Sequence, residues 1–374
     1  MNASLNLPLF AKASLMLIGI YVFVLMLSIG QGIIVPLIFG TIIAIVLHPI
    51  VNFFVRIKLN RVLAITITLL LSFALIAGFG LFIISRLAQF GESWPMLVDK
   101  ITDMINGTIH WIPGYFNISA HKVNTWIAET KTDLLNSSSL VIGQTILSAG
   151  SAMVAIFLIP VYVFLILFYQ PLLLDFIHRI FGVERESKVS VIVTKTKTVV
   201  QRYLVGLFIE TILVAILNSV GLLILGVDYA ILIGVLGGLL NLIPYIGGLV
   251  AVALPMMIAL ATKESPWFAL YVLGIYYFIQ LVDNNYIVPK IVASKVKINA
   301  LVSIIAVLAG GALWGVAGMF LSIPLTAIVK VICDSIDSLK PIGFLLGDTM
   351  PEIVIFKIKS KKLTPKIDAD NQKQ

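Results

Sequence analysis

Charged side chains are scarce in this chain, and so is cysteine. Lys, Arg, Asp and Glu make up 12% of the 374 residues, whereas hydrophobic residues make up 60%. A soluble domain contains about 25% charged and about 45–50% apolar residues. The composition therefore excludes a soluble globular protein and predicts a polytopic membrane protein. The single cysteine, Cys333, excludes an internal disulfide and cannot supply a metal cluster.

Signatures of the common enzyme classes are also absent. The sequence contains no H-E-x-x-H zinc motif, no phosphate-binding G-x-x-x-x-G-K and no G-x-S-x-G nucleophile motif. We therefore expect no enzymatic activity, no cofactor and no bound metal. The missing Walker motif argues against ATP-driven transport by this chain alone. The net charge of +8 fits cytoplasmic loops better than nucleic-acid binding, because no nucleic-acid motif accompanies it.

Long apolar runs dominate the chain instead. A membrane-spanning helix needs about 20 mostly apolar residues. By this measure the sequence predicts six full crossings, at residues 13–29, 31–50, 62–84, 149–170, 203–226 and 266–282. Two further runs, 229–262 and 299–332, contain 34 residues each. A straight helix of that length would measure about 51 Å, whereas the hydrocarbon core of a bilayer is about 30 Å thick.

Each long run is interrupted at its midpoint. N-L-I-P-Y-I-G-G breaks the first run at 241–248, and G-G-A-L-W-G-V-A-G breaks the second at 310–318. Two half-length helices joined by a turn fit each pattern, which predicts a pair of re-entrant hairpins. Two kinked spanning helices are the alternative, because Gly and Pro are common in membrane helices.

The placement of charge favours the hairpins. With hairpins, the lysine-containing loop 283–298 falls in the cytoplasm, together with the basic segments 51–61 and 171–202 and both termini. The predicted fold is an all-α polytopic membrane protein with about six full spans and two opposed re-entrant helical hairpins, or eight spans if the hairpins cross. In inverted-repeat transporters such broken helices meet near the membrane midplane and hold substrate.

The pattern divides the chain into five regions. Segment 85–148 mixes acidic, basic and tryptophan residues, which predicts extracytoplasmic amphipathic helices with Trp94, Trp111 and Trp126 at the membrane interface. The tail is polar and basic, and we expect it to lose order after about residue 350. The regions are an N-terminal three-span unit (1–84), the extracytoplasmic segment (85–148), a fourth span with a cytoplasmic basic linker (149–202), a transport core with both broken runs (203–332) and a cytoplasmic tail (333–374).

Glu210 is the only Lys, Arg, Asp or Glu that lies well inside a predicted span. An acid within the membrane is costly and is a functional candidate by default. Gly206 and Asn218 lie within about a quarter-turn of its helical face, so the three predict a polar stripe toward the protein interior. The stripe indicates proton or cation coupling, or a substrate contact. An interhelical hydrogen bond, or an acid solvated near the interface, is the alternative.

The first break supplies further candidates for a substrate or ion path: Asn241, Pro244, Tyr245, Gly247 and Gly248. Freed carbonyls and helix N-termini at such a break can hold a polar ligand or a cation. A purely structural turn is an equal alternative, since Asn and Gly are favoured in turns for their backbone freedom.

Two more groups of candidates belong to the second half of the core: Asp283, Asn284 and Asn285 before the second run, and Gly310, Gly311 and Trp314 inside it. The first group either caps a helix, which we favour, or binds at the inner mouth of a path. The glycines permit close helix packing, which we favour over a direct role in the path. The tryptophan is either a gate or a packed aromatic.

Four motifs, in order, resemble the autoinducer-2 exporter family of multi-pass inner-membrane transporters. They are Q-R-Y-L-V-G (201–206), G-G-L-L-N-L-I-P-Y-I-G-G (237–248), D-N-N-Y-I-V-P-K-I (283–291) and L-A-G-G-A-L-W-G-V-A-G-M-F-L-S-I-P-L-T-A (308–327). The resemblance covers roughly residues 10–340. It implies a helical transporter in the bacterial cytoplasmic membrane that assembles as a homo-oligomer, with a pentamer as the expected form. Some members export autoinducer-2, a small polar furanone-type molecule, and others are described as sodium or lithium/proton antiporters.

The chain departs from the family pattern in places that concern the substrate more than the fold. Ser294 stands where Gly is frequent, Asn299–Ala300 where His-Pro is frequent, His48 where Asn is common and Asp283 where Glu is common. Family membership by itself does not identify a substrate.

The leading hypothesis is a secondary transporter that exports a small polar molecule of the autoinducer-2 type, from a site between the two hairpin tips. The nearest alternative is a sodium or lithium/proton antiporter that uses Glu210. A lower-ranked alternative is a non-transporting membrane scaffold whose segment 85–148 recruits partners. The expected partners are a small polar solute or a cation, the lipid bilayer and further copies of the chain, but no nucleic acid.

Overall fold

The computed structural model describes residues 8–109, 125, 132, 157–181, 186–243, 247–292 and 297–350. Five helices are long and apolar enough to cross a membrane, and a sixth span is present if the pair Phe157–Phe168 and Gln170–Ile180, bent by 65°, is one span. An all-α polytopic membrane protein is thereby confirmed. The five are α1 (Leu9–Ile29), α2 (Gln31–Arg56), the first part of α3 (Arg61–Ile109), most of α7 (Glu186–Ile224) and α11 (Ala300–Ser335).

Two of these helices continue far beyond their predicted spans. Helix α3 runs to Ile109 without ending near residue 84, and α7 begins at Glu186, inside the predicted linker. The predicted boundaries followed the charges, but a charged face does not end a helix when the other face is packed. In α3 that packed face includes Leu97, which is 4% exposed and lies in the core beside α8 and α9.

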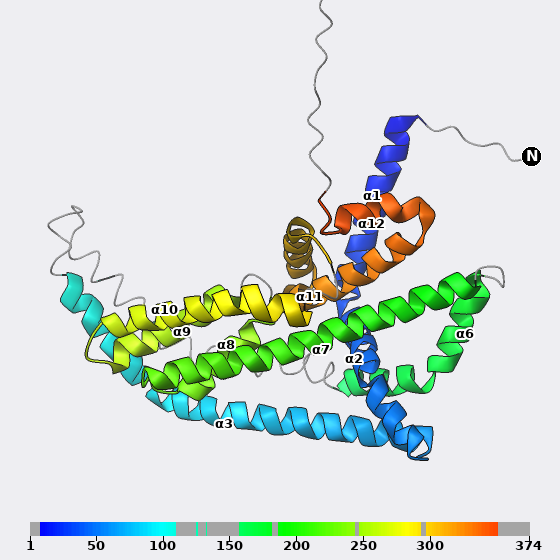
Figure 1. Cartoon of the computed structure of the whole chain (residues 1–374). Coiled ribbons are helices and arrows are strands. Elements are labelled where there is room, and N and C mark those ends of the chain that lie inside the picture. The colour runs from blue at the N-terminus through cyan, green and yellow to red at the C-terminus, as the bar shows by residue number, and fades with distance from the viewer. Residues whose placement is uncertain are drawn as a thin grey trace, which may run out of the picture.

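Trp94 lies inside this continuous helix. It packs in α3 beside Phe90, with ring centroids 5.8 Å apart, and Phe90 meets the Tyr229 ring edge-on at 5.3 Å. Figure 1 shows this end of α3 against α8 and α9. Trp111 and Trp126 lie outside the described residues, as does most of the predicted segment 85–148.

The first long run is broken where the sequence predicts. Helix α8 (Ala230–Leu240) ends just before Asn241, and α9 (Gly247–Thr262) runs back along it. The reversal requires a glycine at position 247, because a Cβ there would overlap the carbonyl group of Leu240. Helix α10 (Trp267–Val282) packs on α9 and continues as the π-helix η2 (Asp283–Val292).

The second long run, α11, is also interrupted at its predicted break. Trp314 and Gly315 have non-helical backbone angles, and Gly315 has a φ of +60°. Residues 310 and 318 would be about 12 Å apart in a straight helix. Instead, a Cβ on Gly310 would overlap the Gly318 carbonyl, so the two halves of α11 fold back on each other.

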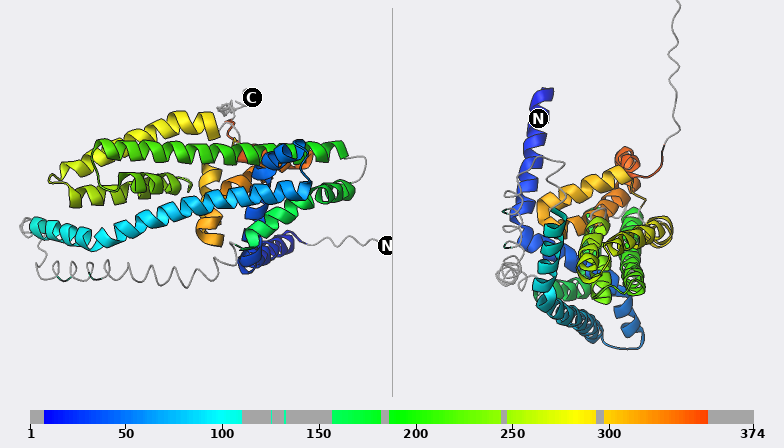
Figure 2. Two further views of the ribbon diagram at one scale, coloured as in Figure 1. Left: turned by 90° about the horizontal axis from the view of Figure 1, so that it is seen from below. Right: turned by 90° about the vertical axis from the view of Figure 1, so that its left-hand side faces the viewer.

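Small residues allow α8 to approach α7 closely. A Cβ on Gly234 would overlap Ser219, and a Cβ on Gly238 would lie 2.6 Å from the Cβ of Ala215. Close contact through Gly, Ala and Ser is typical of helix pairs in membranes, where packing rather than water drives association. Figure 2 shows the resulting bundle of α7 to α10, with α3 running along its side.

Both ends of the described chain lie outside this bundle. Helix α1 has no buried residue and projects in Figures 1 and 2, and its backbone oxygen at Leu27 accepts a 3.0 Å hydrogen bond from Trp314 Nε1. At the other end, η4 (Asp337–Leu339) and α12 (Lys340–Leu346) fold onto the start of α11. There the Asn299 side chain donates to the carbonyls of Leu345 and Gly347, at 2.7 and 3.0 Å. The predicted loss of order after about residue 350 falls on residues that the structure does not describe.

Candidate functional site

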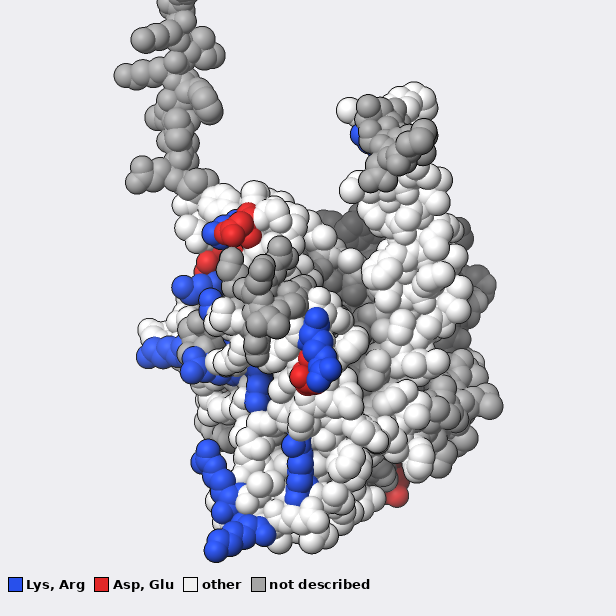
Figure 3. Space-filling model, turned by 90° about the vertical axis from the view of Figure 1, so that its right-hand side faces the viewer, with Lys and Arg blue, Asp and Glu red and all other residues white. Residues whose placement is uncertain are grey.

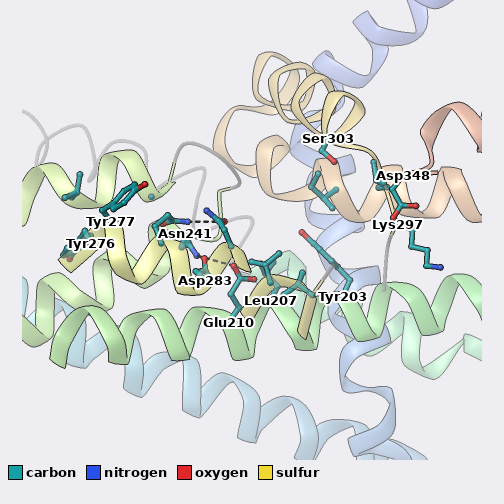
Figure 4. Close-up of a pocket in the computed structure, with 18 of the residues that line it drawn as sticks. Tyr203, Leu207, Glu210, Asn241, Tyr276, Tyr277, Asp283, Lys297, Ser303 and Asp348 are labelled. Carbon is teal, nitrogen blue, oxygen red and sulfur yellow. Dashed lines mark hydrogen bonds between the residues drawn. The ribbon is translucent and has the colours of Figure 1, made fainter. Parts of the chain in front are cut away.

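The buried charge that the sequence singles out is hydrogen-bonded to the first hairpin. Glu210 lies on α7 and is 6% exposed. Asn241, the residue at which α8 ends, donates from Nδ2 to Glu210 Oε1 at 3.3 Å and to Asp283 Oδ2 at 3.1 Å. Figure 4 shows both bonds. A single amide thus joins α7, the hairpin tip and the start of η2.

The carboxylates of Glu210 and Asp283 lie at the same buried site, where little solvent can reach them. Asp283 is 2% exposed, more deeply buried than Glu210, and its Oδ1 has no hydrogen-bond partner among the described residues. A buried carboxylate is costly unless it is paired or hydrogen-bonded.

Asp283 occupies the C-cap position of α10, where its backbone N–H donates to the carbonyls of Gln280 and Ile279. The chain stays helical through this residue, because α10 passes directly into η2. Its side chain turns toward Asn241. The hydropathy pattern places the end of the apolar span at residue 282. It could not show that Asp283, the next residue, is buried beneath α7 and the hairpin tip.

A cavity of about 640 Å³ opens beside the carboxylates, in the size range of small-molecule sites. Its wall is mixed, with phenol, amide and carboxylate groups among aliphatic side chains. Figure 4 shows the carboxylates near its middle and Ser303, Lys297 and Asp348 toward one end. The lining residues are Tyr203, Leu207, Glu210, Asn241, Gly248, Val252, Leu273, Tyr276, Tyr277, Gln280, Asp283, Asn284, Val288, Val292, Lys297, Ile298, Ser303, Ile323 and Asp348.

One face of α10 contributes polar groups that the sequence interpretation missed. Tyr276 and Gln280 line the cavity beside Asp283, which the sequence had singled out, and the Tyr276 hydroxyl is buried without a hydrogen-bond partner among the described residues. Spacings of four and three residues place these side chains on one helical face. That spacing was the available signal, but it lay within an apolar run that we interpreted as an ordinary span.

The structure brings together only part of the predicted path. Glu210, Asn241, Gly248, Asp283 and Asn284 line the cavity. Asn218 is 3% exposed and faces α8, where a Cβ on Gly237 would lie 2.9 Å from its Nδ2. Gly247 shapes the turn, and Asn285 is exposed and donates to the Leu281 carbonyl at 2.8 Å. Pro244 and Tyr245 lie outside the described residues.

The tip of the second hairpin lies elsewhere. Gly310, Gly311 and Trp314 are not among the cavity-lining residues, and the run contributes Ser303 and Ile323 instead. Its tip packs against other parts of the molecule, as the hydrogen bond from Trp314 to α1 shows. Among the described residues, this cavity lies at the first tip, beside α7, α10 and η2, and the second tip does not line it.

The polar groups of the cavity suit hydrogen bonding to a solute better than tight metal binding. Among the described residues, no three His, Cys, Asp or Glu side chains are grouped so that they could hold a metal ion. The carboxylates, amides and phenols of the lining can instead accept hydrogen bonds from and donate them to a hydroxylated molecule, or weakly coordinate a monovalent cation.

Comparisons with known proteins agree with this arrangement. Residues 13–338 match the family described as AI-2E family transporter. The chain is 26% identical over 321 residues to the AI-2 transport protein TqsA of Escherichia coli (strain K12), covering 86% of this chain and 91% of TqsA. It is 26% identical over 343 residues to YhhT, a candidate transport protein of the same organism, covering 86% of this chain and 90% of YhhT. It is 23% identical over 314 residues to YrrI, a candidate transport protein of Bacillus subtilis (strain 168), covering 80% and 86%.

The family match covers most of the chain, including every helix that forms the cavity. The resemblance found in the four motifs is thereby confirmed. The chain belongs to the AI-2E transporter family, and it is a multi-pass membrane transporter, not an enzyme.

Proposed function

We propose that this transporter exports a small polar molecule of the autoinducer-2 type through the cavity beside Glu210. The observation that carries the proposal is the hydrogen-bonded group of Glu210, Asn241 and Asp283 on the cavity wall. A hydroxyl-rich solute can donate to the carboxylates and accept from the amide and phenol groups. The similarity to TqsA, whose name gives AI-2 as its transported molecule, supports the same substrate class.

The geometry of the first hairpin supports a path through the membrane. Helices α8 and α9 contain 11 and 16 residues, which makes them about 17 and 24 Å long, shorter than a hydrocarbon core of about 30 Å. We propose that α8 and α9 enter and leave on the outer side, and that the two halves of α11 do so on the cytoplasmic side. The tip with Asn241 would then lie at membrane depth, as in transporters with broken helices.

Transport of autoinducer-2 by proteoliposomes tests the substrate. Vesicles that contain the purified protein and are loaded with labelled autoinducer-2 are expected to release it faster than protein-free vesicles. Unlabelled autoinducer-2 outside should accelerate the exchange, whereas sugars of similar size should not. Release at the rate of protein-free vesicles, by protein that remains folded, would contradict the proposal.

A cation/proton antiporter is the second candidate, and one observation favours it. Asp283 Oδ1 is buried and lacks a hydrogen-bond partner among the described residues, close to a second carboxylate. Under an imposed sodium gradient, an antiporter is expected to move protons, and Glu210→Gln should abolish that movement. Absence of proton movement in the unaltered protein supports the exporter instead.

Membership of a transporter family favours either of these functions over a non-transporting scaffold.

The proposed topology predicts which loops face each side of the membrane. In a Cys333→Ser background, a cysteine at Glu264 should react with an impermeant thiol reagent applied outside, because the α9–α10 turn faces out. A cysteine at Lys290 should be protected until the membrane is permeabilised, because η2 faces the cytoplasm. The reverse pattern would mean that both long runs cross the membrane. Labelling each variant in intact and in permeabilised cells provides the comparison.

The remaining parts of the proposal concern location and assembly. We expect the chain in the bacterial cytoplasmic membrane, with both termini in the cytoplasm, as the distribution of basic loops indicates. We also expect a homo-oligomer, with a pentamer as the expected form. Mass measurement of the purified complex, corrected for bound detergent, tests this assembly.

A further inference from the structure

A second polar centre, with no residue in common with the cavity lining, lies around His48 near the end of α2. His48 Nδ1 is 3.0 Å from Lys197 Nζ on α7 and 3.2 Å from Asn52 Nδ2. An ammonium group can only donate, so Nδ1 must be the accepting nitrogen and the imidazole must be neutral, with Nε2 as its donor. At this contact, therefore, no anion neutralises the positive charge of Lys197.

Two grooves meet at His48 and Asn52, with volumes of about 320 and 290 Å³. The first is bordered by Arg56 and Lys197, and the second by Arg61. Neither groove has an Asp or Glu among its described lining residues. The lining residues are His48, Pro49, Asn52, Phe53, Arg56, Lys197 and Gln201 in the first groove, and His48, Val51, Asn52, Val55, Arg61, Leu167, Gln170, Pro171 and Leu174 in the second.

Among the described residues, no carboxylate neutralises the cations of these grooves. Arg61 Nη2 donates to the Leu167 carbonyl at 2.6 Å and to Gln170 Oε1 at 3.4 Å, both of which are uncharged. Neither Arg56 nor Lys197 forms an ion pair with a described residue. Like charges that are gathered in a concave site repel one another unless an anion enters.

The surroundings of the grooves indicate what kind of anion fits. Helix α2 is an apolar candidate span that ends at Arg56, and the grooves lie near that end, where a span would leave the membrane. Apolar side chains on this part of α2 are exposed, with Ile50 at 44% and Phe53 at 60%. Figure 3 shows the end of the molecule formed by α6 and the start of α7, where Lys and Arg side chains gather with few acids between them. An amphiphile can place apolar chains on α2 and a negative group in the grooves.

We propose that the grooves around His48 bind the phosphate headgroup of an anionic phospholipid. The guanidinium of Arg56 or Arg61 can bind phosphate oxygens in a two-pronged geometry, and Lys197 adds a point charge. Basic pockets between membrane helices on the cytoplasmic side bind such headgroups in general. A free phosphate ion shares the charge but gains nothing from the exposed apolar side chains beside the groove, which favours the lipid.

Native mass spectrometry of the full-length protein in detergent tests this site. With phosphatidylglycerol and phosphatidylcholine of identical acyl chains added together, the unaltered protein is expected to retain phosphatidylglycerol preferentially. The double variant Arg56→Gln, Lys197→Gln should lose at least about tenfold in phosphatidylglycerol affinity, since each cation near a membrane surface contributes roughly a fivefold factor. The charge-preserving variant Arg56→Lys, Lys197→Arg should retain most of the binding.

A matched control variant distinguishes specific binding in the grooves from general electrostatic attraction by the net charge of the protein. Arg179→Gln with Lys290→Gln removes the same charge from residues that line neither groove. This control should bind phosphatidylglycerol like the unaltered protein. Equal losses in both double variants would overturn the proposal in favour of general attraction. Displacement of phosphatidylglycerol by an equal concentration of inorganic phosphate would overturn the lipid as the ligand. Circular dichroism of each variant verifies that it is folded.

Discussion

Replacing Asn241 by Leu is expected to reduce transport at least about tenfold while the protein stays in the membrane. The substitution keeps a similar volume but removes the donor to both Glu210 and Asp283. A buried polar group that loses its partner costs about 1–3 kcal/mol, and 1.4 kcal/mol corresponds to a factor of ten. Initial transport rates in proteoliposomes, normalised to folded protein, measure the effect.

Asn285→Leu is the matched control for this experiment. Asn285 also donates a hydrogen bond, but it is exposed and its partner is the Leu281 carbonyl, outside the cavity. This variant should transport at close to the normal rate. Asn241→Asp should be at least as damaging as Asn241→Leu, because it brings a third carboxylate next to two others. Normal transport by Asn241→Leu would mean that the hydrogen-bonded group plays no part in the path.

Gly247→Ala is expected to lower the stability of the protein by at least about 2 kcal/mol. The added methyl group would overlap the backbone carbonyl of Leu240, which cannot move without opening the hairpin. Overpacking of this kind typically costs 1–3 kcal/mol or more. Thermal unfolding in detergent, followed by size-exclusion chromatography with fluorescence detection, measures the shift.

Gly274→Ala provides the comparison for the hairpin variant. Gly274 lies in α10, and a Cβ there would meet no atom within 4 Å. The substitution should therefore leave the unfolding temperature unchanged or raise it slightly, because Ala favours a helix more than Gly does. Equal unfolding temperatures for both variants would show that the turn at Gly247 tolerates a side chain.

The sequence predicted the features that arise from local chemistry. Both breaks fall where expected, because Gly and Pro interrupt helices whatever surrounds them. The run at 241–248 separates α8 from α9, and the backbone leaves helical geometry at Trp314 and Gly315 inside 310–318. Glu210, the charge that the sequence places well inside an apolar run, is buried in the structure rather than solvated.

The features that depend on tertiary packing could not be predicted. Hydropathy separates a span from a linker by charge, so it could not show that α3 and α7 continue as single helices through charged segments. It placed Asp283 beyond the end of a span, but η2 carries this residue under the hairpin tip. Both long runs have the same length and break near their midpoints, yet among the described residues only the first tip reaches the cavity, whereas Trp314 at the second donates a hydrogen bond to α1.

The shared amide of Asn241 has a thermodynamic consequence. Its hydrogen bonds hold the hairpin tip to α7 and to η2, and Glu210 and Asp283, the two residues that accept them, also line the cavity. A solute that binds these carboxylates in place of Asn241 would weaken the attachment of the hairpin tip. Because thermodynamic coupling is reciprocal, detachment of the tip would change the affinity for the solute by the same factor. Occupancy of the cavity and position of the hairpin are then two variables of one equilibrium, and measuring either reports on the other.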